Sequence, residues 1–112
     1  MYTRSAIFEG TIRPGLEEAF YAEVERTLLP IWRRLPHALS VRLHRPVRRD
    51  DGVRAVFLIQ EIDYPSLEAI DAAMASSVRD EARAAHERIM PMYDGTHHHI
   101  VSARFGEPAA AG

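Results

Sequence analysis

The sequence contains no cysteine and no lysine, and all fourteen of its basic residues are arginine. Without cysteine, a disulfide, a thiolate nucleophile and a cysteine-ligated metal are all excluded. No apolar run approaches the roughly 20 residues that span a bilayer. Met1 to Gly10 also lacks the basic segment and long apolar run of a signal peptide. We therefore expect a soluble, cytoplasmic protein.

Motifs for common cofactors and nucleophiles are missing as well. The chain has no glycine-rich phosphate loop, no nucleophile elbow and no dinucleotide fingerprint, and we expect no cofactor. The formal charge of -2 gives no reason to expect nucleic acid or an anionic membrane as a partner. With 112 residues, we expect one domain over 1–105 and a flexible tail over 106–112.

The first third of the chain reads as a strand followed by a helix. Thr3 to Gly10 predicts a strand, which the Arg13-Pro14-Gly15 turn ends. From Leu16 to Leu35 apolar residues fall three or four apart, which predicts an amphipathic helix. Pro30 lies inside this pattern. Because proline removes a backbone donor, we expect a kink near Glu25 to Leu29.

The middle of the chain predicts two strands joined at Asp51-Gly52. Leu39 to His44 alternates apolar and polar residues, as in a half-buried edge strand. From Val53 to Ile62 both faces are apolar. One face is expected to carry Val53, Ala55, Phe57 and Ile59, and the other Val56, Leu58 and Ile62. Helices on one side of a sheet cover only one face, so we predict that a second copy of the chain covers the other.

The last third predicts a helix and a final strand. Pro65 begins the helix with Ser66 or Asp63 as its cap, Ser76-Ser77 interrupts it, and Pro91 ends it. Thr96 to about Phe105 follows as a strand. The order strand, helix, strand, strand, helix, strand predicts an α+β, ferredoxin-like βαββαβ fold with a four-stranded antiparallel sheet.

Two segments carry a resemblance to a known family. The first helix ends Leu28, Leu29, Pro30, Ile31, Trp32, Arg33, Arg34, Leu35, Pro36, His37, and the second begins Tyr64-Pro65-Ser66-Leu67-Glu68-Ala69. Over roughly residues 3–105 the chain resembles the dimeric α/β barrel superfamily, and best its EthD-like branch, named for ethyl tert-butyl ether degradation. The resemblance implies a homodimeric α/β barrel with a small-molecule cavity.

The chain departs from the EthD-like pattern, His-x-Pro-Leu, three residues, then Leu-Pro-Gly, at two positions. Leu28 stands where the family has a histidine, so an acid–base role at that position is not expected here. His37 replaces the glycine after Pro36 and must adopt whatever backbone angle that turn requires.

The most chemically suggestive segment is His97-His98-His99. Alternate residues of a strand share a face, so His97 and His99 should face the helices while His98 faces away. Three interpretations stay open for this pair: partly exposed residues at a frayed strand entry, ligand contact or acid–base catalysis, and metal binding. Metal binding would need a further ligand from His86, Glu9 or Glu61.

Other side chains could line the cavity or simply pack. His86, Trp32, Phe20 and Leu28 are candidate ligand contacts, and each could instead be an amphipathic or core residue. Three strand arginines could bind an acidic group, lie on solvated faces or form dimer salt bridges: Arg4, Arg42 and Arg104.

Our leading hypothesis is a homodimer that binds a small, largely apolar or aromatic molecule between helices and sheet, with His97 and His99 as catalytic candidates. The resemblance implies cofactor-independent oxygenation, isomerisation or cyclisation. Such chemistry needs little beyond a shaped cavity and one or two proton-transfer groups. The alternative is a noncatalytic accessory or interaction protein whose cavity is filled by its own Trp32, Phe20 and Leu28.

Overall fold

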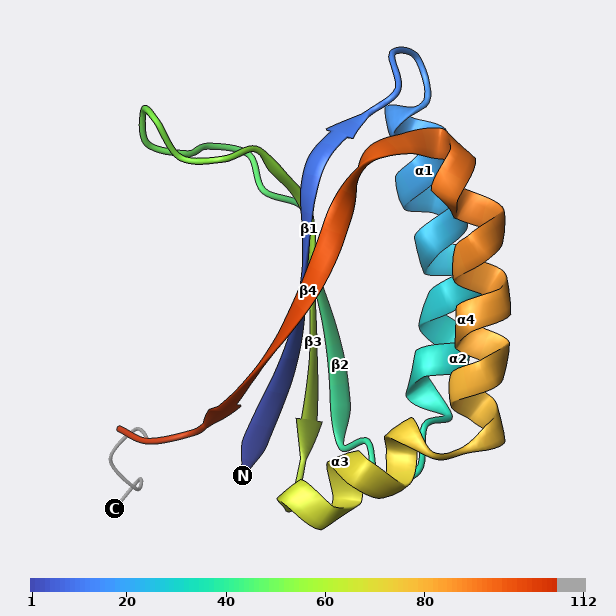
Figure 1. Ribbon diagram of the computed structural model, residues 1–112, viewed down its shortest axis with the longest axis vertical. Helices are drawn as coiled ribbons and strands as arrows, with labels where there is room; N and C mark the ends of the chain where they lie inside the picture. The colour runs from blue at the N-terminus through green and yellow to red at the C-terminus, as the bar shows by residue number, and fades with distance from the viewer. Residues whose placement is uncertain (107–112) are drawn as a thin grey trace, which may run out of the picture.

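The computed structural model describes residues 1–106. Over these residues, four antiparallel strands form one sheet in the order β2-β3-β1-β4, with the helices on one face and none on the other (Figure 1). The predicted α+β ferredoxin-like βαββαβ fold is confirmed. Of the predicted tail, residues 107–112 lie outside the described part of the chain. The elements are β1 (Tyr2–Ile12), α1 (Glu17–Glu23), the π-helical η1 (Val24–Leu28), α2 (Leu29–Arg33), β2 (Ser40–His44), β3 (Val56–Tyr64), α3 (Leu67–Met74), α4 (Ser77–Ile89), the 3-10 turn η2 (Met90–Met92) and β4 (Tyr93–Ala103).

The first helical segment is irregular where the sequence predicts a kink. η1 widens the helix to a π turn between α1 and α2, and Pro30 lies in the first turn of α2. In a regular α-helix the proline ring would clash with the carbonyl of Arg26, four residues earlier. The wider turn is the irregularity that accommodates the proline. His37, in the turn after α2, has a φ of 66°, where the family pattern has glycine.

Ser66 and Ser76 begin the two later helices. The Ser66 hydroxyl accepts a hydrogen bond from the Ala69 amide at 3.0 Å, and the Ser76 hydroxyl accepts one from the Arg79 amide at 3.3 Å. Each hydroxyl satisfies an amide that has no partner within its helix. The predicted interruption at Ser76-Ser77 is therefore the start of α4, which lies on the sheet beside α2 (Figure 1).

A β-bulge changes the expected faces of β3. Phe8 pairs with Leu58 but Glu9 pairs with Val56, which leaves Phe57 as the extra residue. Phe57 turns toward the helices, where its ring packs against Phe8 and its carbonyl accepts a hydrogen bond from the Tyr21 hydroxyl at 2.6 Å. The expectation that Phe57 shares a face with Val53, Ala55 and Ile59 is wrong, and β3 begins only at Val56.

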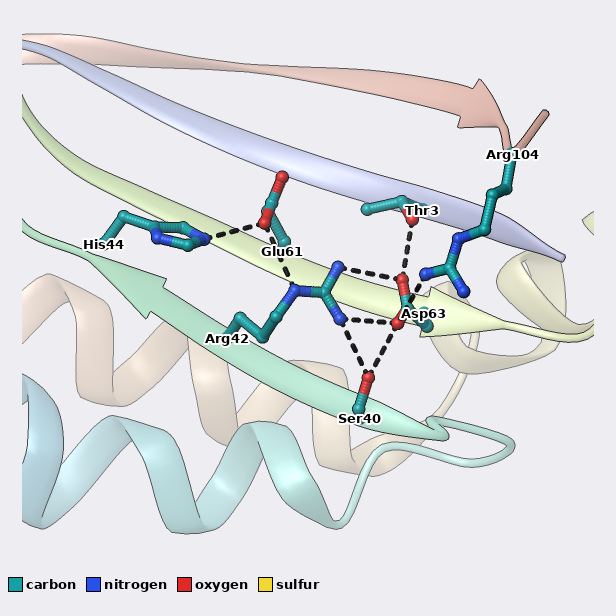
Figure 2. Close-up of polar contacts among 7 residues, drawn as sticks. All are labelled: Thr3, Ser40, Arg42, His44, Glu61, Asp63 and Arg104. Carbon is teal, nitrogen blue, oxygen red and sulfur yellow. Dashed lines mark hydrogen bonds and ion pairs between the residues drawn. The ribbon is translucent and has the colours of Figure 1, made fainter. Parts of the chain in front are cut away.

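The helix-free face of the sheet is therefore more polar than predicted. Arg42 of β2 and Asp63 of β3 form its central ion pair, and Asp63 also accepts hydrogen bonds from Thr3, Ser40 and Arg104 (Figure 2). Ile7 of β1 pairs with Ile59 of β3 on the same face. The prediction of a second copy over this face rested on β3 being apolar on both faces. The structure bears this out only in part.

The core lies between the sheet and the helices. Its centre is an aromatic group in which the rings of Phe8, Phe20, Phe57 and Tyr93 pack at centroid separations of 5.0 to 6.3 Å. Leu28 and Trp32 extend this core along the helical segment. Within residues 1–106, no helix is both long and apolar enough to cross a membrane.

Candidate functional site: a cavity between sheet and helices

A cavity of about 180 Å³ lies between the sheet and helices α2, α3 and α4. Drug-sized ligands take pockets of roughly 300–1,000 Å³, so this cavity suits a smaller molecule of one or two rings. Its apolar walls are Ala6, Phe8, Trp32, Leu35, Ile62, Met74 and Ala82. Its polar lining is Arg4, Gln60, Arg79, Arg83, His86, His97 and His99.

The pleat of β4 directs two histidines into this space. His97 pairs with Phe8 and His99 with Ala6 across the β1–β4 ladder, so both imidazoles share the helix-facing side with these buried residues. Both histidines lie inside the ladder rather than at a frayed strand entry. β4 is an edge strand, and both residues remain exposed. The cavity is therefore open to solvent along β4.

His86 reaches the same space from α4. Its ring lies edge to face with the His97 ring at a centroid separation of 4.9 Å, and His97 meets His99 in the same way at 5.4 Å. The Nε2 atom of His86 lies 2.7 Å from the Tyr93 hydroxyl. Helix and strand thus bring three imidazoles into one continuous group.

The environment keeps these imidazoles neutral at physiological pH. Burial lowers the pKa of His99 to about 4, and the positive charge of Arg4 acts in the same direction. Burial and Arg4 also lower the pKa of His97, while burial and His97 lower that of His86. A neutral imidazole has a free ring nitrogen that can accept a proton.

The fixed charge in the cavity is positive. Arg4 of β1 and Arg79 of α4 both line it, and none of its lining residues is a carboxylate. Within residues 1–106, the Arg4 side chain makes no hydrogen bond or ion pair, and the one hydrogen bond of the Arg79 side chain goes to the Met74 sulfur, at 2.6 Å. Burial and the charge of Arg79 lower the pKa of Arg4, yet a guanidinium remains protonated in proteins.

Two buried polar atoms near this site also lack partners. Gln60 is 5% exposed and lines the cavity, and its Oε1 atom accepts no hydrogen bond from the described residues. The Tyr64 hydroxyl is fully buried and likewise unpaired within that part of the chain. Burial raises the pKa of Tyr64, and the charges of Arg4 and Arg79 oppose that rise.

The structure brings together four of the six predicted site residues. His97, His99, His86 and Trp32 line the cavity. Phe20 and Leu28 do not, because Phe20 is at most 1% exposed inside the aromatic group and Leu28 packs one helical turn before Trp32. Both are core residues in place of the predicted ligand contacts.

Sequence reasoning overlooked three residues of the polar lining: Arg79, Arg83 and Gln60. Arg79, Arg83 and His86 fall four and three residues apart on α4, which places them on one helical face. That spacing is visible in the sequence. Among the strand arginines, Arg4 lines the cavity, whereas Arg42 and Arg104 bind Asp63. Gln60 carries no comparable signal, since an isolated polar residue in an apolar strand has no spacing to reveal its role.

A metal site does not form from the proposed residues. Among residues 1–106, no group of three or more His, Asp or Glu side chains is arranged to hold a metal ion. Glu9 lies 4.0 Å from His98, on the helix-free face, and Glu61 binds Arg42 and His44 there. Neither carboxylate reaches the His97–His99 pair.

Comparison with known proteins gives matches among solved structures alone. No protein-family model matches the sequence, and none of the curated proteins matches it significantly. An ethyl tert-butyl ether degradation (EthD) family protein from Bacillus halodurans superposes with a TM-score of 0.69 at 20% identity, over 94% of this chain and 100% of that one. SnoaB, a cofactor-independent oxygenase from Streptomyces nogalater, gives 0.65 at 16% identity over 97% of each chain. A dimeric ferredoxin-like protein of unknown function from Thermobifida fusca gives 0.62 at 17% identity, over 92% of this chain and 90% of that one.

These likenesses establish the fold. The expected resemblance holds as a likeness of fold, since the matching structures include an EthD family protein and a cofactor-independent oxygenase. Identities of 20% or less do not carry an activity from one chain to another, because one fold hosts many functions.

Proposed function

We propose that this chain binds a small, largely apolar or aromatic molecule in the cavity between sheet and helices, and that His97 and His99 exchange protons with it. The observation that carries the proposal is the three-imidazole group on the polar side of a cavity whose other walls are apolar. Apolar walls with a few convergent polar groups are typical of small-molecule sites.

The proton-transfer role follows from the state of the imidazoles. His99 is neutral at pH 7 because its pKa is lowered to about 4. Its free ring nitrogen can therefore take a proton from a C–H or O–H group of the ligand that is acidic enough for a base of this strength. The electron pair stays on the ligand, and the proton returns at another atom in an isomerisation or after ring closure in a cyclisation. Cofactor-independent oxygenation, the activity of SnoaB, would share this first step and would then consume molecular oxygen.

The noncatalytic alternative requires a cavity that the chain fills itself. Trp32 lines the cavity, Phe20 and Leu28 lie in the core, and a volume of about 180 Å³ stays open. The open volume favours ligand binding over a purely structural role.

A cavity-filling variant tests ligand binding. Ala82 of α4 lines the cavity, so Ala82→Leu would occupy part of the space that a ligand needs. Ala84 is exposed on the same helix, and Ala84→Leu is the matched control. In thermal-shift screens of one- and two-ring compounds we expect hits with the wild type and Ala84→Leu, and none with Ala82→Leu. A wild type that responds to no compound at millimolar concentration would contradict the proposal.

Proton transfer is tested with a ketone that fits the cavity. We expect the protein to accelerate exchange of the α C–H protons of 1-tetralone in deuterium oxide, followed by NMR. Removal of a general base commonly costs about 10²–10⁴-fold in rate, so His97→Gln/His99→Gln should lose at least about tenfold of the acceleration. Equal exchange with wild type and double variant would exclude these histidines as the base.

We also propose a homodimer that uses the helix-free face of the sheet. Ile7 and Ile59 pair there, and Ile100, which is 48% exposed, lies on the same face in β4. A solvent-facing sheet would not be expected to carry isoleucines on three adjacent strands. The likeness to the dimeric protein from Thermobifida fusca supports the same arrangement.

Sedimentation tests the dimer. At micromolar concentration we expect about twice the chain mass of 12.7 kDa, and the mass of a single chain would refute the proposal. Ile7→Asp places a charge in the proposed interface and should give monomers. Ala84→Asp, at an exposed position of α4 on the helix-covered side of the sheet, should leave the dimer intact.

A further inference from the structure

We propose that the cavity selects organic acids, and that Arg4, Arg79 and Gln60 bind the carboxylate of a small aromatic or apolar molecule. This inference rests on the proposed ligand-binding function and adds the chemical class of the ligand. It follows from the charges and unpaired polar atoms that line the cavity.

The positions of Arg4 and Arg79 lower the stability of the folded state. Arg4 and Arg79 carry like charges, and burial together with the charge of Arg79 lowers the pKa of Arg4. Neither binds a carboxylate among residues 1–106. Partly buried guanidinium groups are ordinarily paired, because removing their hydration is unfavourable. A bound anion would supply the missing partner.

Within residues 1–106, an arginine in a second hollow of the same protein is paired, unlike the two cavity arginines. Arg45 lines a hollow beside Tyr21 and Leu43, and its guanidinium is already neutralised by Glu18 at 2.9 Å and by Glu17 at 3.7 Å. It also lies over the Tyr21 ring at 4.2 Å. The chain thus supplies an internal partner where a guanidinium serves structure, and leaves out that partner in the histidine cavity.

Gln60 is an independent sign of a ligand. An unpaired buried acceptor is unfavourable and rare in native structures, and the Oε1 atom of Gln60 is such an acceptor on the cavity wall. Either orientation of this amide leaves a polar atom able to bind a ligand oxygen, as donor to a carboxylate or as acceptor from a hydroxyl. Pairing with Ala6 across the β1–β3 ladder holds Gln60 on the same face as Arg4.

The rest of the lining limits the kind of anion. Trp32, Leu35, Ile62 and Met74 form apolar surface that an inorganic anion would leave unfilled. A planar carboxylate matches the forked donors of arginine. In a molecule with an apolar or aromatic ring system and one carboxylate, the ring system would pack against the apolar walls and the carboxylate would bind the arginines.

The test compares a carboxylate with its neutral isostere. 2-Naphthoate and 2-naphthamide have the same ring system and similar shape. Binding is measured by calorimetry at pH 7 and constant ionic strength, with inorganic phosphate as a third probe. We expect 2-naphthoate to bind at least tenfold more tightly than 2-naphthamide, and phosphate to give no measurable binding.

Substitutions assign the effect to the cavity. Arg4→Met and Arg79→Met keep an apolar stem but remove the charge, and each should abolish the preference for 2-naphthoate. Arg4→Lys should restore part of it. Arg88→Met removes an exposed arginine of the same helix that does not line the cavity, and it should behave as wild type. Because the cavity arginines pair with no carboxylate among residues 1–106, their methionine variants should melt no lower than wild type in the absence of ligand.

The outcomes separate this inference from the proposed function. If the acid and the amide bind equally, or if both methionine variants keep the preference, acid selection is wrong while ligand binding stands. If phosphate binds as tightly as 2-naphthoate, the site binds any small anion whether or not it carries an apolar ring system. The inference is then also wrong. If neither naphthalene compound binds, the inference is wrong, and the proposed function fails as well when the thermal-shift screen also yields no ligand.

Discussion

The imidazole of His97 stacks on the ring of Phe8, with centroids 5.0 Å apart and ring planes at 21°. Phe8 is 4% exposed and belongs to the core, so an exposed histidine is held against a rigid surface. His86 meets the same imidazole edge to face from α4. Strand pairing and helix packing together thus position the His97 ring at the cavity, although β4 is an edge strand.

The hydrogen bond between His86 and Tyr93 should contribute measurably to stability. The hydroxyl lies 2.7 Å from Nε2 in a half-buried site, and Tyr93→Phe would leave that nitrogen unpaired. We expect a loss of about 1 kcal/mol in the free energy of unfolding by urea. Tyr2→Phe is the control, since the Tyr2 hydroxyl bonds to none of residues 1–106, and it should change stability by less than about 0.5 kcal/mol. Equal losses would show that this hydrogen bond is not important.

His99 should make stability fall in mild acid. Its pKa is lowered from 6.5 to about 4 in the folded state, so between these values the unfolded chain binds more protons than the folded one. Stability from this group is complete above about pH 6.5 and declines as the pH falls toward 4. The full shift corresponds to roughly 3 kcal/mol, and solvent at the open cavity reduces the expected loss to about 1 kcal/mol.

Urea unfolding at pH 7 and pH 4.5 measures this effect. His99→Gln has no titrating group at the position and should lose less stability than wild type between the two pH values. His98→Gln alters the neighbouring residue on the other face of β4 and should retain the decline that His99 produces. An identical decline in wild type and His99→Gln would contradict the assignment.

The sequence predicts the histidine placement because it depends only on strand alternation. His97 and His99 face the helices as a two-residue period requires. Pro30 likewise predicts the irregular helix, since its clash with the preceding turn is local. Long-range geometry is less accessible. The bulge at Phe57 depends on the pairing of β1 with β3, so the sequence around Phe57 alone gave the wrong faces.

The charged side of the cavity illustrates a second limit. Arg4 and Arg79 lie on a strand and a helix far apart in the chain, and only the fold brings both to one cavity. Each one by itself resembles an ordinary surface arginine. What makes them informative is that no carboxylate among residues 1–106 lines the cavity with them, which no sequence pattern expresses.

The ion pair on the helix-free face should be important for stability. Asp63 is 4% exposed and accepts hydrogen bonds from Arg42, Thr3, Ser40 and Arg104. Asp63→Asn removes the charge and leaves Arg42 without its buried partner. We expect a loss of about 2–3 kcal/mol in the free energy of unfolding by urea at pH 7. The exposed pair Arg34–Glu81 is the control, and Glu81→Gln should cost far less stability than Asp63→Asn because water screens an exposed pair.

Asp63 should also govern the response to strong acid. The hydrogen bonds from Arg42, Thr3 and Ser40 hold its pKa well below the usual value of 3.8. A lowered carboxyl pKa stabilises the fold above the unfolded value, and that contribution is lost as the pH falls below about 4. Wild type should therefore lose more stability than Asp63→Asn between pH 4 and pH 2.5. Parallel declines would mean that other carboxylates dominate acid unfolding.

Close backbone contact between Gly10 and Gly95 should make Gly95 intolerant of any side chain. The two glycines pair directly across β1 and β4, and a Cβ atom on Gly95 would lie 2.1 Å from the Glu9 carbonyl oxygen. That oxygen belongs to the backbone of the central strand and cannot move aside without disturbing the ladder. We expect Gly95→Ala to cost about 3 kcal/mol in urea unfolding.

Gly15→Ala is the control for replacing a glycine where the new Cβ atom meets no neighbouring atom. Gly15 has a φ of 82° and no atom near the position of a Cβ, so alanine there should cost only about 1 kcal/mol. Equal costs would show that β4 can shift away from β1. If Gly95→Ala is the more damaging change, the same contact fixes the start of β4. It then also fixes the position of His97, two residues further along the strand, so the variant should weaken ligand binding as well as the fold.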